Sequence, residues 1–200
     1  MRTITRRAAF ALLGLLPAAI AWTEIREPMT LEPQSKLWIK GNSTMRAFEC
    51  KATVVDAAVD AEGPDAAAAV LGGKKAVRTV QVKVPASKLD CGNGTMNDHM
   101  LKALKAKEHQ TIEFRLTSYD MSPAGDTMQG QLTGTLNIGG VQKTVTISAK
   151  ATEGTNGTLH VVGSHDVSMK EFGLKPPSLM MGTMKVDERV KVSFDLFLKG

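Results

Sequence analysis

The side chains with the most distinctive chemistry in this 200-residue sequence are its four histidines and two cysteines. The histidines (His99, His109, His160 and His165) form no pair at a metal-binding spacing, and the cysteines lack the C-x-x-C spacing of zinc sites. The sequence contains no G-x-S-x-G nucleophile turn, no H-E-x-x-H motif and no Gly-rich phosphate loop. We therefore predict no catalytic residue, no metal site and no cofactor.

His165 is the histidine best placed to meet a ligand. It shares strand parity with Val161 and Val167, so its imidazole is expected to face the inside of a sheet or barrel. There it would contact the polar headgroup of a bound molecule. The alternative is a core histidine that hydrogen-bonds to the backbone.

Cys50 and Cys91 are expected to form a disulfide bond if the protein is exported to an oxidising compartment. The closed loop would span about forty residues and stabilise the fold by roughly 4 kcal/mol in the chain-entropy description. Two buried thiols, or two metal ligands, are the alternatives.

Residues 1–21 have the features of an export signal. Three arginines precede an apolar run, residues 8–21, which ends in the small-residue pattern A-I-A. The run is shorter than the ~20 apolar residues that a membrane span needs, and no other segment is long enough. We expect cleavage near Ala21, a periplasmic or secreted protein and no integral membrane span. The general and twin-arginine export routes both stay open, and an uncleaved anchor is the alternative.

The charge of the chain gives no sign of a polyanion partner. Removing the three leader arginines from the formal charge of +5 leaves +2, which is too little to favour nucleic acid. Aromatic residues make up 4% of the chain, too few for a surface that stacks single-stranded bases. We predict no nucleic-acid partner.

One helix is expected at about residues 95–107. Asn93-Gly94 signals a turn, and Thr95 followed by Asp98 has the spacing of a capping box. Met96, Met100 and Leu104 then share one helix face. A shorter alanine-rich helix is expected to open at Pro64 and stop at Gly72-Gly73, as a surface element.

The other patterns have the period of two that is typical of strands. Alternation is expected over residues 36–41, 48–59, 80–84, 112–119, 128–138, 141–149, 159–169 and 190–198. Gly139-Gly140 is a two-residue hairpin turn. Residues 22–35 have no clear period and are expected to be a linker or flap. The predicted fold is all-β, an eight-stranded antiparallel barrel over residues 36–200 with an inserted helix; a two-sheet sandwich is the alternative.

Strand parity also predicts which side chains face inward. They are Ile39, Phe48, Val54, Val82, Phe114, Leu116, Met128, Leu132, Leu136, Val145, Ile147, Val161 and Phe194. An eight-stranded barrel can be filled by such side chains or can hold one ligand. By itself this pattern favours a filled barrel, although small residues at the inward positions Gly130, Gly134 and Ala52 leave room for a ligand.

Three stretches resemble the YceI-like family in one order across residues 36–198. The segment LDCGNGTMNDHMLKALKAKEHQTIEF resembles its L-D-x-G turn, R-x-x-H helix start and I-x-F strand end. LNIGGVQKTVTISA resembles its L-T-I-x-G-V-T-K-P-V-T-L hairpin, and MKEFGLKPP its R-x-D-F-G segment. Met96 and Glu171 depart from the family's arginine and aspartate, whereas His99, Phe172 and Gly173 keep its pattern.

The resemblance implies an exported lipocalin-like barrel that binds a long apolar lipid of the polyisoprenoid or isoprenoid-quinone type without catalysis. Phe172 and His165 would then join the inward residues as lumen contacts. Two alternatives stand beside it: an exported enzyme or metal-handling protein centred on His165 and His99, and a ligand-free structural barrel. A homodimer is compatible with all three.

Overall fold

The computed structural model describes residues 26–179 and 183–200. Its strands are β1 (Arg26–Leu31), β2 (Lys36–Ser43), β3 (Ala47–Ala52), β4 (Asp56–Glu62), β5 (Val77–Pro85), β6 (Leu89–Asp90), β7 (Thr111–Ala124), β8 (Thr127–Ile138), β9 (Val141–Glu153), β10 (Leu159–Ser168), β11 (Ser178–Leu179) and β12 (Met184–Lys199). The α-helices are α1 (Ala66–Leu71) and α2 (Gly94–Ala103), and the 3-10 turns are η1 (Ala86–Lys88), η2 (Thr155–Gly157) and η3 (Met169–Phe172). The expected export signal lies outside the described residues.

Eight of these strands form a closed antiparallel barrel, in the order β1-β4-β5-β7-β8-β9-β10-β12. Closure comes from the pairing of β1 with the end of β12, at Thr30 with Lys199 and Leu31 with Leu198. At the other end of the barrel, β2 pairs with the first part of β12, β3 pairs with β2, and β6 pairs with β3. The predicted all-β barrel is therefore confirmed.

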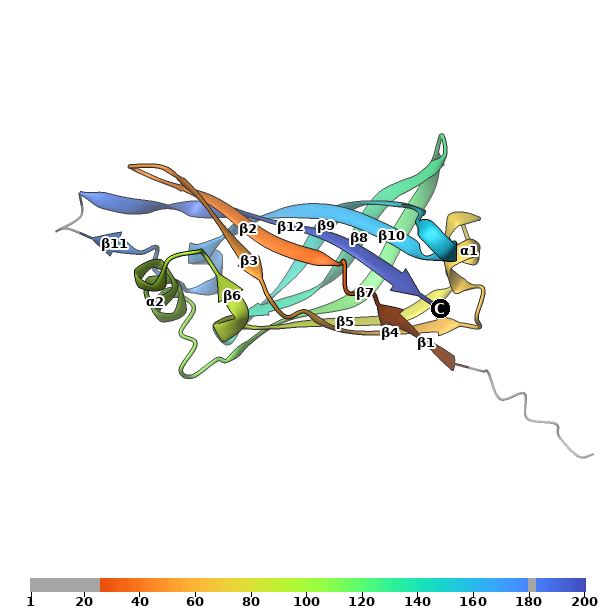
Figure 1. The fold of residues 1–200 in the computed structure, drawn as a ribbon, viewed down its shortest axis with the longest axis horizontal. Helices are drawn as coiled ribbons and strands as arrows, with labels where there is room; N and C mark the ends of the chain where they lie inside the picture. The colour runs from red at the N-terminus through yellow and green to blue at the C-terminus, as the bar shows by residue number, and fades with distance from the viewer. Residues whose placement is uncertain (1–25, 180–182) are drawn as a thin grey trace, which may run out of the picture.

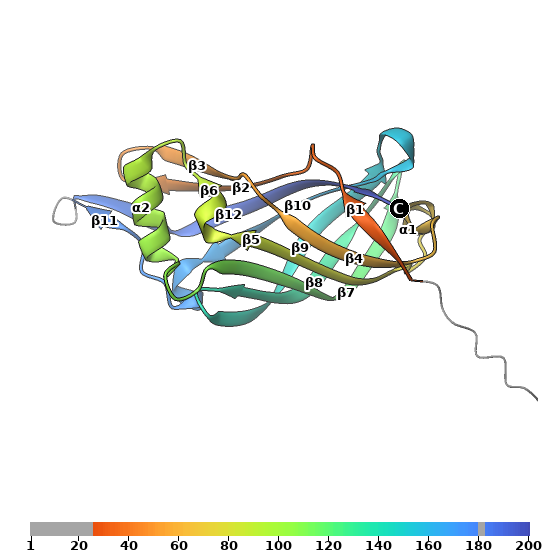
Figure 2. The same cartoon turned by 60° about the horizontal axis from the view of Figure 1, so that its bottom comes forward.

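The two helices lie at opposite ends of the barrel (Figures 1 and 2). At one end, Ala66 and Ala67 of α1 are buried against the barrel, and Val70 of the same helix is 5% exposed. Short side chains let this face of the helix approach the strands closely, so α1 closes the end of the barrel. Its other face keeps Ala68 exposed, as expected of a surface element. At the other end, none of the residues of α2 is fully buried.

Each end of the barrel has its own apolar cluster. The cluster beneath α1 contains Met29, Val59, Ala61, Ala66, Ala67, Val70, Ala76, Met128, Ala151, Leu159 and Leu198. The cluster at the α2 end contains Ile138, Val145, Val167, Met169, Phe172 and Leu174. Between them the barrel is not packed solid, as described below.

Three local predictions are corrected by the structure. Residues 26–31, expected in a linker or flap, form the closing strand β1, because β4 and β12 offer it free edges on both sides. The single strand expected over 48–59 is interrupted at residues 53–55, so that β3 and β4 pair with different partners. The N-cap of α2 is Asn93, whose side chain accepts a hydrogen bond from the Met96 amide, and not Thr95.

Candidate functional site

The barrel encloses a cavity, the lumen, of about 630 Å³. Its lining reaches from Val70 of α1 at one end to Met96 and Met100 of α2 at the other. Because the helices stand at opposite ends of the barrel (Figure 1), the lumen runs along its length. This volume falls within the range of about 300–1,000 Å³ typical of small-molecule sites.

Three phenylalanine rings explain why the lumen stays open although its wall carries large side chains. Phe48 and Phe194 stand in register opposite Gly41 and Gly163 on neighbouring strands. A Cβ atom added to either glycine would lie within 2.5 Å of the facing ring, and the Phe114 ring covers Gly134 in the same way. The far end of each ring therefore rests against the wall, over a position that has no side chain.

Replacing Gly41 with alanine should push one of these rings into the lumen. The new Cβ would lie 2.5 Å from Cζ of Phe48 and 3.1 Å from a Val190 methyl, with no backbone atom among its three nearest neighbours. The ring can yield by turning inward, where it displaces about one methylene of ligand, worth ~0.8 kcal/mol or roughly fourfold in affinity.

Titration of wild type and Gly41→Ala with a long-chain isoprenoid measures this effect. Gly94→Ala is the matched control, because a Cβ at Gly94 meets no atom within 4 Å. Unchanged affinity in Gly41→Ala would show that the Phe48 ring does not limit the space available to ligand.

The open end of the lumen, here called the mouth, is formed by Ser43, Met45 and Arg46 of the β2–β3 turn together with Asn93 and Thr95 at the start of α2. Met45 is 70% exposed although it lines the cavity. The flexible thioether side chain of methionine can adapt to an apolar ligand that passes this rim.

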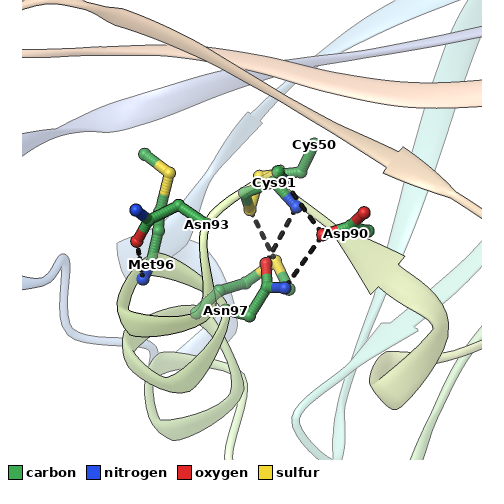
Figure 3. The surroundings of a disulfide bond; sticks show 8 residues. Cys50, Asp90, Cys91, Asn93, Met96 and Asn97 are labelled. Atoms are coloured by element: carbon green, nitrogen blue, oxygen red, sulfur yellow. Dashed lines mark hydrogen bonds between the residues drawn. A yellow bond between two sulfur atoms is a disulfide. The ribbon is translucent and has the colours of Figure 1, made fainter.

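Helix α2 is fastened to the barrel beside the mouth by covalent and polar bonds (Figure 3). Cys50 of β3 and Cys91 form the predicted disulfide, with 3.9 Å between their Cα atoms. The Cys91 amide donates to Oδ1 of Asn97 at 2.8 Å, and Nδ2 of Asn97 donates to Asp90 at 2.9 Å. Cys50 and Cys91 both line the lumen, so the disulfide that holds α2 also forms part of the wall beside the mouth.

The Asp90 carboxylate makes this anchor sensitive to acid. The hydrogen bonds from Asn97 and from the Gly92 amide hold the pKa of Asp90 below its usual value. Because this pKa is lower in the folded than in the unfolded protein, the ionised carboxylate stabilises the fold fully at pH values above the pKa of the unfolded state. The stabilisation is lost as the pH falls through the pKa of the folded state.

We therefore expect wild type to unfold at a higher temperature than Asp90→Asn near neutral pH, and the difference to shrink as the pH falls below the ordinary pKa of an aspartate. Thermal unfolding followed by circular dichroism at a series of pH values measures the difference. A gap between the two proteins that persists unchanged in acid would contradict this role of the carboxylate.

Most of the residues predicted to face the ligand do line the lumen. These are Ile39, Phe48, Val82, Phe114, Leu116, Leu132, Leu136, Ile147, Val161, His165 and Phe194. That they contact a ligand stays a prediction.

Four predicted lumen residues are not part of the cavity lining. Val54 is 37% exposed, because it falls in the break between β3 and β4 where strand parity no longer holds. Met128 packs beneath α1, and Val145 packs in the cluster at the α2 end. Phe172 belongs to η3, after β10 has ended, and fills the same cluster.

Sequence reasoning missed the residues of the mouth and also Tyr119. The mouth residues belong to a turn and a helix start, where no period marks the inward side. Tyr119 lines the lumen, and its hydroxyl accepts a hydrogen bond from the Val77 amide at 3.1 Å. Burial raises the pKa of this hydroxyl. A register shift after Leu116 changes the parity of β7, which hid Tyr119 from the alternation.

His99 and His165 both line the lumen. Within residues 26–179 and 183–200, no group of three His, Cys, Asp or Glu side chains is placed to hold a metal ion. On the outer face, the His160 ring stacks on Phe197. Its Nδ1 shares a hydrogen bond with the Thr152 hydroxyl, and its Nε2 lies 2.7 Å from a carboxylate oxygen of Asp195. This row links β9, β10 and β12 away from the lumen.

Among the described helices, neither is long and apolar enough to cross a membrane.

Several solved structures share this fold. BcnA from Burkholderia cenocepacia is 23% identical, with a TM-score of 0.61 over 82% of this chain and 95% of BcnA. A polyisoprenoid binding domain from Saccharophagus degradans, implicated in plant cell wall breakdown, is 11% identical, with a TM-score of 0.62 over 86% of this chain and 97% of that domain. The YCEI protein of Campylobacter jejuni is 17% identical, with a TM-score of 0.56 over 74% of this chain and 82% of that protein. These likenesses establish the fold alone.

No curated protein sequence matches this one. The YceI-like domain, however, matches residues 33–198, which is most of the chain. The resemblance drawn from the three sequence segments is thereby confirmed: this chain belongs to the YceI-like domain family.

Proposed function

We propose that this protein binds a long apolar lipid of the polyisoprenoid or isoprenoid-quinone type in its lumen, and that it carries or stores the lipid without altering it. The observation that supports this most is the lumen itself, about 630 Å³, walled by aliphatic and aromatic side chains from α1 to α2. An elongated apolar space between two ends suits an elongated apolar ligand.

The energetics favour such a ligand. Each methylene-sized unit that leaves water for the lumen contributes about 0.8 kcal/mol, so a few isoprene units suffice for tight binding. Branched prenyl chains match a wall of valine, leucine and isoleucine. The fold shared with a polyisoprenoid binding domain adds support from a different direction.

The N-terminal segment supports export, after which the protein would act in the periplasm or outside the cell. The disulfide between Cys50 and Cys91 fits an oxidising compartment of that kind. A protein in that setting would move a water-insoluble lipid through an aqueous space.

The lumen weighs against a ligand-free barrel filled by its own side chains. The remaining alternative, an enzyme or metal-handling protein centred on His165 and His99, is open to a direct test. Two measurements separate this alternative from lipid carriage. One is the metal content of the purified protein, and the other is the amount of lipid bound by His165→Ala and His99→Ala.

The proposal is tested by purifying the exported protein from cells and analysing it by native mass spectrometry and solvent extraction. We expect a co-purifying isoprenoid, and uptake of added isoprenoid by protein that has been stripped of lipid. The proposal would be overturned if the purified protein holds no lipid and the stripped protein takes up neither a short-tailed ubiquinone nor squalene.

A further inference from the structure

The barrel wall of the lumen is almost entirely apolar, and its exceptions are informative. Among the described strand residues that line it away from the mouth, the polar side chains are Tyr119 and His165, apart from the disulfide. The Tyr119 hydroxyl already accepts a hydrogen bond from the Val77 amide. His165 is different.

The imidazole of His165 has no partner within the described part of the protein. No hydrogen bond, ion pair or ring contact involves it, so it is not the backbone-bonded core histidine of the alternative interpretation. Every buried side-chain nitrogen or oxygen that is shut away from solvent has a partner. The ring nitrogens of His165 therefore open onto the lumen, ready to donate or accept a hydrogen bond.

The position of His165 along β10 places it inside the barrel and not at the rim. It stands opposite Val192 of β12, three residue pairs from the Arg189 end of that ladder and six from the Leu198 end. At about 3.3 Å per residue, roughly 10 Å of strand separates it from the edge nearest α2, and roughly 20 Å continues toward α1. A ligand group at His165 would thus leave the deeper lumen for a tail.

The charges around the lumen decide which polar group suits this place. Arg46 is the sole lysine or arginine side chain among the described lining residues, and it belongs to the mouth. A phosphate at His165 would be buried without a compensating cation, which is costly. A neutral oxygen, by contrast, needs a single hydrogen bond.

We infer that His165 determines specificity by hydrogen-bonding a neutral oxygen of the lipid head, a quinone carbonyl or a hydroxyl, while the isoprenoid tail extends toward α1. This inference rests on the proposed function and sharpens it. It predicts that the lipid enters tail first, past the mouth beside α2, and that an isoprenoid quinone or alcohol is preferred to a prenyl phosphate.

The experiment compares wild type, His165→Leu and His165→Gln by calorimetric titration with three probes: a short-tailed ubiquinone, squalene and geranylgeranyl phosphate. Loss of one hydrogen bond in His165→Leu should weaken ubiquinone binding about tenfold. Squalene has no oxygen, so its affinity should change less than about twofold, which also shows that the variant is folded. His165→Gln should recover most of the ubiquinone affinity, because its amide can make the same bond.

The outcomes separate this inference from the function on which it rests. Equal changes for ubiquinone and squalene, or none for either, would overturn the role of His165 and leave lipid binding standing. Tighter binding of geranylgeranyl phosphate than of ubiquinone by wild type would overturn the preference for a neutral head. Failure of wild type to bind any probe would overturn the proposed function as well.

Discussion

Replacing Leu132 with tryptophan should weaken the binding of a long isoprenoid about fiftyfold. Leu132 lies in the middle of β8, lines the lumen and stands opposite Ile147 of β9. The larger ring has no glycine opposite it to lie against, so it must occupy lumen space. Displacing about three methylene-sized units of ligand costs ~2.4 kcal/mol, which is roughly fiftyfold in affinity.

The control is Gln131→Trp, one residue earlier on β8. Gln131 is exposed and has the opposite parity, so the same ring there points to solvent and should leave the affinity unchanged. Overpacking can itself destabilise a core by about 1–3 kcal/mol, so thermal unfolding of both variants is measured beside ligand titration. Full binding by a folded Leu132→Trp protein would place the ligand outside the lumen.

Reducing the Cys50–Cys91 bond should lower the melting temperature by roughly 10 °C. The bond closes a loop with a sequence separation of 41, worth about 4 kcal/mol in the chain-entropy description, and each kcal/mol corresponds to about 2–4 °C for a domain of this size. Helix α2 should be the first element to lose its structure, because none of its residues is fully buried and the disulfide lies just before its first turn.

Differential scanning calorimetry with and without reductant measures this shift, and Cys50→Ala/Cys91→Ala provides the reference. The double variant should have the same melting temperature as the reduced wild type, and reductant should not change it. Amide hydrogen exchange in α2 should rise in both, and bound isoprenoid should dissociate faster, since α2 supplies Met96, His99 and Met100 to the lumen wall. Free thiols in unreduced protein, with an unchanged melting temperature, would refute the prediction.

Much of the barrel was readable from alternation because period-two burial is a local property of a strand. β8 and β9 show this most clearly: the turn at Gly139-Gly140 fixes their register, and the inward set Leu132, Leu136 and Ile147 follows from parity. Parity failed where the register shifts or the strand ends. Val54 and Tyr119 are the examples, one wrongly included and the other missed.

The small inward residues show the limit of local reasoning most sharply. Gly134 was read as room for a ligand, yet the Phe114 ring covers it, and the space arises because the ring lies on the wall. Gly130 leaves no space at all, since a Cβ there would strike the backbone oxygen of Asp120. Both facts depend on partners across the β7–β8 hairpin, which the alternation within one strand does not reveal.

Local sequence patterns predicted the strand-rich class of the fold, the helix before β7, the pairing of the two cysteines and the inward side of each regular strand. These follow from periodicity and composition, which act over neighbouring residues. The tertiary structure alone decided that β1 closes the barrel, that α1 plugs one end, and that the imidazole of His165 faces an apolar lumen without a protein partner. Each of those depends on which distant strands meet, because closure and enclosed volume are properties of the whole sheet.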